Sequence, residues 1–325
     1  MLKRVALPLI AVLALSACGG GPSGESPSTG ATGGTTPAGD SLTVVTAFYP
    51  LEWASSQVLG DAGTVTTLTA PGVEPHDLEL TPRQVASLAD ADLVVYLKGF
   101  QSAVDEAVEQ SGAKNVLDVS TVVNLVPTAE EHEHEHDEAD DDEEEGHDHD
   151  HGAFDPHFWQ DPERMVAVVN ALKDKLSAAM PDDATQLSAN AEATVKTLND
   201  LNGEFTTGLA SCERKEFITT HEAFHYLAER YGLTQIGISG INPDAEPSPA
   251  RVAEIHDEAK EHGITTIFFE TLTSPALAEA IAGDLGLKTA VLDPLEGVTA
   301  TSPGTDYPSI MRANLEALRT ANGCQ

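Results

Sequence analysis

The chain has 325 residues, and 53 acidic residues against 17 basic ones give it a formal net charge of −36 at pH 7. This balance excludes a nucleic-acid-binding protein, because contacts with phosphates need clustered Lys and Arg. An excess of carboxylates instead favours cations as partners.

The first residues have the pattern of an export signal. Lys3 and Arg4 precede an apolar run from Val5 to Leu15, which is shorter than the roughly 20 residues that cross a bilayer. Residues 1–17 are therefore expected to be a cleaved signal peptide. The small residues before Cys18 resemble a bacterial lipoprotein processing site. The resemblance implies a lipid on Cys18 and anchoring at the outer face of the cell membrane; the alternative is a plain signal peptide with an incidental cysteine.

Residues 18–40 are expected to be a flexible tether after the lipidated cysteine, because residues 19–40 are almost entirely Gly, Ser, Thr and Pro. About 285 residues remain, enough for two domains of ordinary size.

Residues 41–161 are predicted to form a first α/β lobe. Four short segments rich in β-branched residues have the pattern of strands, and three segments between them have helical spacing. The predicted strands are Leu42–Phe48, Thr64–Thr69, Asp92–Leu97 and Asn115–Val119, and the predicted helices are Leu51–Leu59, Pro82–Ala89 and Ser102–Ser111. Strands that alternate with helices indicate a parallel sheet.

Residues 162–211 are predicted to be linking helices with a break near residues 180–183. The stretch Ala184–Leu209 is rich in Ala and Leu and favours a helix. About 25 helical residues would extend nearly 38 Å, long enough to brace two lobes.

Residues 212–325 repeat the alternation and are predicted to form a second Rossmann-like lobe. The predicted strands are Glu216–Thr220, Thr234–Ser239, Thr265–Glu270 and Thr289–Asp293, and the predicted helices are Ala223–Tyr231, Pro249–His262, Pro275–Leu285 and Pro308–Ala321. Because the chain is predicted to be exported, a disulfide between Cys212 and Cys324 is the default expectation. Free thiols or zinc ligands are the alternatives.

Four coordinating side chains lie at strand ends or in equivalent loops. His76 follows the second predicted strand, His157 precedes the linking helices, His221 follows a strand directly, and Asp293 ends one. Ligands of open α/β sheets bind outside the carboxyl ends of the strands, so facing lobes would bring these residues together. Three imidazoles and a carboxylate suit Zn²⁺, although imidazole also binds Mn²⁺, Cu²⁺ and Ni²⁺.

The segments GVEPHDLELTP, DPHFWQDP, THEAFHYLAERYGL and VLDPLEG resemble, in this order, the zinc/manganese-type (cluster A-I) solute-binding proteins of bacterial ABC transporters. The resemblance implies two α/β lobes joined by a long rigid helix, a metal in the cleft between them, and a membrane permease as partner.

The resemblance also implies that the metal ligands are His76, His157, His221 and Asp293. The fourth position varies within the family, so Glu74 and Glu296 are substitutes for Asp293. His225 stands where the family usually has a small residue; an ordinary helix histidine is the favoured interpretation, and an auxiliary metal ligand is the alternative. We expect a monomer that captures Zn²⁺ and catalyses nothing.

Residues 129–151 hold 14 acidic residues, no Lys or Arg, and six histidines: His132, His134, His136, His147, His149 and His151. Such a segment cannot form a core, and we expect it to be disordered and to bind zinc weakly. In the resembling family such loops accompany zinc-type members, which favours zinc over manganese. A purely solvating acidic loop and a manganese receptor remain the alternatives.

Two other function classes compete with a receptor. His221-Glu222-Ala223-Phe224-His225 matches the H-E-x-x-H pattern of zinc metalloproteases. The strand-like residues that run into His221, however, place it before the helix, so the two histidines would not project in parallel. An adhesin that a metal stabilises is the other class, but nothing in the sequence points to an exposed adhesive patch.

Overall fold

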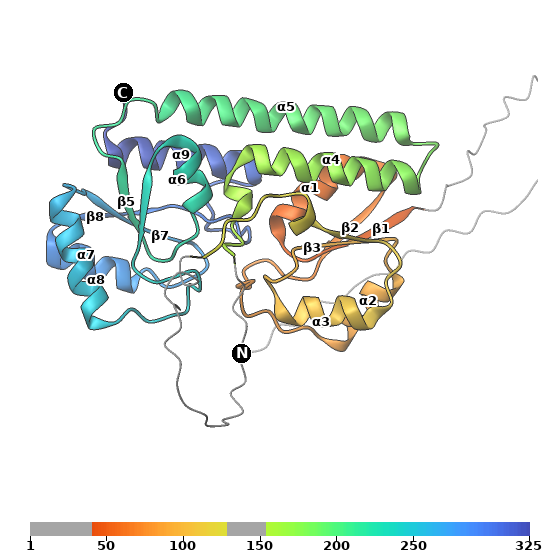
Figure 1. The fold of residues 1–325 in the computed structure, drawn as a ribbon, viewed down its shortest axis with the longest axis horizontal. Coiled ribbons are helices and arrows are strands. Elements are labelled where there is room, and N and C mark those ends of the chain that lie inside the picture. The colour runs from red at the N-terminus through yellow and green to blue at the C-terminus, as the bar shows by residue number, and fades with distance from the viewer. Residues whose placement is uncertain (1–40, 129–153) are drawn as a thin grey trace, which may run out of the picture. The chain divides into compact units, whose positions relative to one another are not determined.

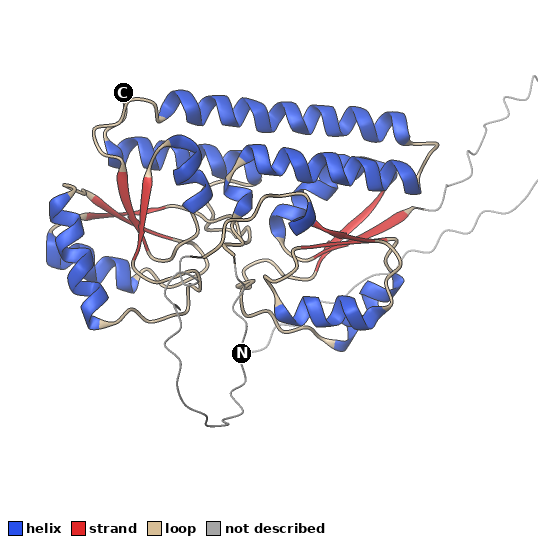
Figure 2. Cartoon of the chain, viewed as in Figure 1, coloured by secondary structure: helices blue, strands red, loops and turns tan. Residues whose placement is uncertain are grey.

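The computed structural model describes residues 41–128 and 154–325 (Figures 1 and 2). The predicted signal peptide, Cys18, the tether and the six histidines of the acidic segment lie outside the described residues. Among the helices that the structure describes, none combines the length and apolar character needed to cross a membrane.

The first lobe is a four-stranded parallel sheet with the order β2-β1-β3-β4. Its strands are β1 (Leu42–Thr46), β2 (Gly63–Thr67), β3 (Leu93–Tyr96) and β4 (Val116–Asp118). Its helices are α1 (Tyr49–Leu59), α2 (Pro82–Asp90) and α3 (Ser102–Ser111), with short 3-10 turns η1 (Gly60–Ala62) and η2 (Val119–Thr121). Helix α2 begins at a proline behind a capping box, in which Thr81 and Gln84 satisfy each other's backbone N–H groups.

The second lobe repeats this topology, with the parallel order β6-β5-β7-β8. Its strands are β5 (Glu216–Thr219), β6 (Thr234–Gly237), β7 (Thr266–Phe269) and β8 (Lys288–Val291). Its helices are α6 (His225–Tyr231), α7 (Pro249–Glu261), α8 (Ala276–Leu285) and α9 (Tyr307–Asn322). The predicted fold class, two parallel-sheet lobes, is confirmed.

Two helices connect the lobes: α4 (Pro162–Ala179) and α5 (Ala184–Gly208), preceded by the 3-10 turn η4 (Phe158–Gln160). Helix α5 packs against α4, against α1 of the first lobe and against α9 of the second, and Figure 1 shows it running alongside both lobes. The break between α4 and α5 falls where Met180-Pro181 predicted it. The long helix therefore contacts both lobes, as expected.

One hydrophobic core runs through both lobes and the connecting helices. Its largest buried members include Phe48 of the first lobe, Trp159 of η4, Phe205 of α5 and Tyr307 of α9. A second, isoleucine-rich cluster lies within the second lobe, between its sheet and helices α7 and α8. The lobes are consequently joined by shared apolar packing as well as by the chain.

Polar contacts add to this junction. The buried carboxylate of Asp161 accepts a hydrogen bond from the N–H of Glu163 at the start of α4, and Arg230 of α6 donates to both of its oxygens at 2.6–3.0 Å. A paired and hydrogen-bonded carboxylate tolerates burial that an isolated one would not. The structure also contains the expected Cys212–Cys324 disulfide, which links the end of α5 to the end of α9.

Candidate metal site

Three imidazoles gather around one carboxylate oxygen. The Nε2 atoms of His76, His157 and His221 lie 3.4, 3.1 and 3.5 Å from Oε1 of Glu296, and the Nε2 atoms of His76 and His157 are 3.3 Å apart. His157, His221 and Glu296 are almost fully buried, and the side chain of His76 is 9% exposed. Four donor atoms of these residue types within 4.8 Å of one another can hold a metal ion.

The four side chains come from loops of both lobes. His76 lies in the loop between β2 and α2, and His157 lies immediately before η4. His221 follows β5, and Glu296 lies in the loop between β8 and α9. The strands are parallel within each sheet, so the loops after them leave the same edge, as expected for ligand sites of α/β folds.

Two of the imidazoles are oriented by carboxylates behind them. Nδ1 of His157 is 2.7 Å from Oδ1 of Asp155, and Nδ1 of His221 is 2.9 Å from Oε1 of Glu270. A carboxylate only accepts, so Nδ1 carries the proton in each ring. Once Nε2 gives up its own proton, its lone pair can bind a cation while Nδ1 stays protonated, which is how such partners commonly fix the tautomer of a metal-binding histidine.

The same contacts shift the protonation of the unloaded site. Burial lowers the pKa of His157 and His221, but the facing carboxylates outweigh this effect and raise both pKa values above the usual 6.5. Burial also lowers the pKa of His76. Its effect there exceeds the opposing effect of Glu296, so the pKa of His76 lies below 6.5. The pKa of Glu296, which burial alone would raise, is held well below its usual range by the three imidazoles that face it. A negative carboxylate at the centre suits the arrival of a cation.

The structure places Asp293 outside this cluster. One of its oxygens accepts a hydrogen bond from the N–H of Leu295 at 2.8 Å and the other accepts one from Thr271 Oγ1 at 3.0 Å. Asn314 of α9 pairs with both the N–H and the carbonyl oxygen of Asp293. The carboxylate of Asp293 therefore stabilises the turn. Glu296, which the sequence analysis named as a substitute, lies among the imidazoles instead.

The turn between these two acids has an unusual backbone. Leu295 has φ of 61°, the left-handed region that a leucine rarely adopts. The carbonyl oxygen of Pro294 accepts hydrogen bonds from Trp159 Nε1 at 2.7 Å and Gln160 Nε2 at 2.5 Å. The surrounding contacts thus fix a strained turn, as is common at functional sites, and place Glu296 three residues beyond Asp293.

The other substitute, Glu74, lies beside the imidazoles in a second group with Glu270 and Glu296. Its Oε1 accepts a hydrogen bond from the N–H of His76. Burial, with the charge of Glu296, raises the pKa of Glu74 to about 8.

His225 does not join the site. It is the first residue of α6, and its side chain is exposed, whereas His221 is buried four residues earlier, before the helix begins. The protease pattern needs both histidines on one face of an established helix, and the structure does not provide that.

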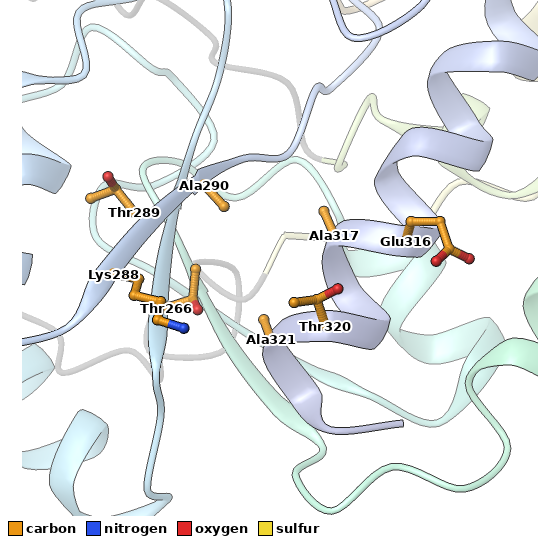
Figure 3. Close-up of a pocket in the computed structure, with 8 residues that line it drawn as sticks. All are labelled: Thr266, Lys288, Thr289, Ala290, Glu316, Ala317, Thr320 and Ala321. Carbon is orange, nitrogen blue, oxygen red and sulfur yellow. The ribbon is translucent and has the colours of Figure 1, made fainter. Parts of the chain in front are cut away.

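A shallow cavity of about 350 Å³ lies elsewhere in the second lobe (Figure 3). It is formed by β7, β8 and α9, where alanine and threonine side chains such as Ala290, Ala317 and Thr320 face one another, with Lys288 and Glu316 also in its lining. None of the predicted metal ligands lines it.

Asp155 and Glu270 were not among the predicted site residues. Glu270 ends the predicted strand Thr265–Glu270, so the rule that identified Asp293 applied to it equally. Asp155 directly precedes Pro156-His157, and its spacing from His157 was the available signal.

Comparison with known proteins agrees with the motifs. The family described as zinc-uptake complex component A, periplasmic (ZnuA), matches residues 44–321. The zinc-binding protein AdcA of Streptococcus pyogenes serotype M3 is 39% identical over 283 residues, which cover 85% of this chain and 55% of that protein. The chain thus spans about half the length of the AdcA relatives that it matches. The high-affinity zinc uptake system protein ZnuA of Bacillus subtilis is 38% identical over 286 residues, covering 86% of this chain and 88% of that protein.

Solved structures give the same picture. The Zn(II)-bound ZnuA-like domain of Streptococcus pneumoniae AdcA superposes with a TM-score of 0.71 at 36% identity, covering 87% of this chain and 99% of that one. The laminin-binding protein Lmb of Streptococcus agalactiae, described as bifunctional with adhesin and metal transporting activity, has a TM-score of 0.74 at 31% identity, covering 86% and 99%. The resemblance inferred from the sequence motifs is confirmed, and the chain belongs to the family of zinc-uptake complex component A proteins.

Proposed function

We propose that the protein is the exported zinc receptor of an ABC transporter, which captures Zn²⁺ and delivers it to a membrane permease. The spacing of the donor atoms carries this proposal. A tetrahedral zinc ion with bonds of 2.0–2.1 Å separates its ligand atoms by about 3.3 Å. The three imidazole Nε2 atoms lie 3.1–3.5 Å from Oε1 of Glu296, the Nε2 atoms of His76 and His157 are 3.3 Å apart, and all four residues offer donor atoms within 4.8 Å of one another. His76, His157, His221 and Glu296 are the proposed ligands.

The ligand types favour zinc over manganese, because manganese sites take more oxygen ligands than this set of three imidazoles and one carboxylate provides. Relatives named for zinc, including the Zn(II)-bound AdcA domain, support the same cargo.

Attachment to the membrane is part of the proposal. A lipid on Cys18 and the tether after it would keep the receptor at the outer face while leaving it free to reach the permease. The relative from Streptococcus pneumoniae is named a zinc-binding lipoprotein, which supports this anchor. We further propose that the receptor acts as a monomer and has no enzymatic activity.

The acidic segment 129–151 is proposed to collect zinc weakly near the site. Its 14 acidic residues attract divalent cations over about a Debye length. Deleting the segment should slow capture at low zinc and leave one tight equivalent intact. Loss of that equivalent would show that the segment itself is the primary site.

Metal analysis of the purified protein tests the receptor proposal. The wild type should retain one tight zinc per chain in competition with a chelator and prefer zinc to manganese, and His157→Ala should lose the tight zinc. In cells, a knockout should grow poorly on zinc-depleted medium and recover when zinc is added. A protein without stoichiometric zinc, or a knockout indifferent to zinc, would contradict the proposal.

We do not extend the adhesin activity of the Lmb relative to this chain. Across residues 41–128 and 154–325, only Val73 and Val122 are large hydrophobic residues with exposed side chains. Two scattered valines do not form the contiguous apolar patch that marks many protein-binding surfaces.

A further inference from the structure

A group of three carboxylates adjoins the histidine cluster. Oxygens of Glu74, Glu270 and Glu296 lie within 4.8 Å of one another. Glu296 belongs to both groups, so a cation bound to it can contact either the carboxylates or the imidazoles.

Several oxygens in this group have no partner. The side chain of Glu270 is 2% exposed and that of Glu296 is fully buried. In the part of the chain that the structure describes, Oε2 of each has no hydrogen-bond partner, and neither does Oε2 of Glu74. A buried carboxylate oxygen without a donor is costly, and a cation among the three would remove that cost.

Glu74 is the member of this group that faces solvent. Its side chain is 18% exposed, compared with 9% for His76 and at most 2% for the other two imidazoles and Glu296. A cation arriving from solvent therefore meets Glu74 before it meets the buried ligands.

We propose that Glu74, Glu270 and Glu296 form an outer cation position through which the cargo passes to and from the imidazoles. This inference rests on the proposed function. Carboxylates and water are ligands that divalent cations accept without strict selectivity, so a partly hydrated ion can bind there first. The ion then keeps its bond to Glu296 while imidazoles replace the outer ligands, and it never crosses the buried site uncoordinated.

Zinc binding and release rates test this proposal, measured by stopped flow on the full chain with Glu74→Gln. Glutamine keeps an oxygen that accepts the N–H of His76, so the loop should retain its conformation. Because an intermediate site lowers the barrier in both directions, we expect the variant to slow both binding and release, each about tenfold, with a smaller change in the dissociation constant.

Glu79→Gln is the matched control, since it makes the same side-chain change at an exposed position in the same loop. It should leave both rates near those of the wild type. An equal slowing of binding by the control would assign the effect to long-range attraction and overturn the proposal. Unchanged rates in Glu74→Gln, or faster release with unchanged binding, would overturn it too. A wild type that fails to bind zinc would instead reject the receptor function itself.

Discussion

The indole Nε1 of Trp159 donates a 2.7 Å hydrogen bond to the carbonyl oxygen of Pro294. Trp159 lies two residues after His157, and Pro294 lies two residues before Glu296, so this bond directly joins the segments that carry two of the proposed ligands. It therefore helps to hold His157 and Glu296 in place before a cation arrives.

Trp159→Phe should weaken zinc binding more than its loss of stability suggests. The variant keeps an aromatic ring in the core but leaves Pro294 with Gln160 as its remaining donor. We expect a loss of about 1–3 kcal/mol in unfolding free energy and a weaker affinity in chelator competition. Trp53→Phe, another tryptophan of the same core, serves as the comparison. Equal affinity losses in both variants would contradict a specific role for the bond.

Asp155→Asn should lower zinc affinity although Asp155 is not a proposed ligand. The asparagine oxygen can still accept the proton of His157 Nδ1, but the negative charge that makes the ring a stronger donor to metal is lost. Removal of such partners typically costs 10–100-fold in metal affinity, so a decrease of about tenfold is expected. Chelator competition measures it, and an unchanged dissociation constant would contradict the role given to Asp155.

Asp293 and Glu296 should act as one unit. Glu296→Gln removes a proposed ligand and should weaken zinc binding by roughly 100-fold, whereas Asp293→Ala should release the turn that positions Glu296. Adding Asp293→Ala to Glu296→Gln should then cost little further affinity, because residues that work through one contact are not additive. Absorption spectra of the Co²⁺-loaded variants should report the same loss of a ligand.

Asp293→Asn is the milder control for this pair. It keeps an oxygen for the N–H of Leu295 and should recover most of the affinity. Fully additive losses in the double variant would show that Asp293 binds the cation independently.

Zinc affinity should rise with pH through and above pH 6.5. In the unloaded protein the pKa values of His157 and His221 are raised above 6.5, so protons occupy the imidazoles over that range and zinc must displace them. The same shifts stabilise the unloaded fold below pH 6.5, and that stabilisation is lost as the pH rises through the folded-state pKa values. Calorimetry in buffers of different ionisation enthalpy measures the protons that are released when zinc binds. A zinc affinity independent of pH between about 6 and 8 would contradict these protonation states.

Most of the fold was predictable because its signals are local. Alternating short β-branched runs and helical spacings located every strand that the structure describes, with ends displaced by at most two residues. The predicted strand Thr289–Asp293, for example, is observed as β8 from Lys288 to Val291. Helices α2 and α4 begin at Pro82 and Pro162, where the fixed φ of proline suits the first helical turn.

The fourth residue of the cluster was harder to predict, because its position depends on a turn that the sequence disfavours. Asp293 ends its predicted strand and was the natural choice, but its oxygens are taken by Leu295 and Thr271. The left-handed backbone at Leu295 depends on contacts with residues far away in the sequence, among them Trp159 and Asn314. Local secondary-structure propensity does not depend on such long-range contacts. The position of Glu296 could therefore be determined only from the folded structure.

The apolar core that runs through both lobes and α5 also limits how the proposed permease could recognise the zinc-loaded protein. A wide separation of the two lobes would expose that packing to water. A large hinge motion therefore cannot distinguish the zinc-loaded protein from the unloaded one. Recognition should depend on the ordering of surface loops around the cation, and small-angle scattering should give the same radius of gyration with and without zinc.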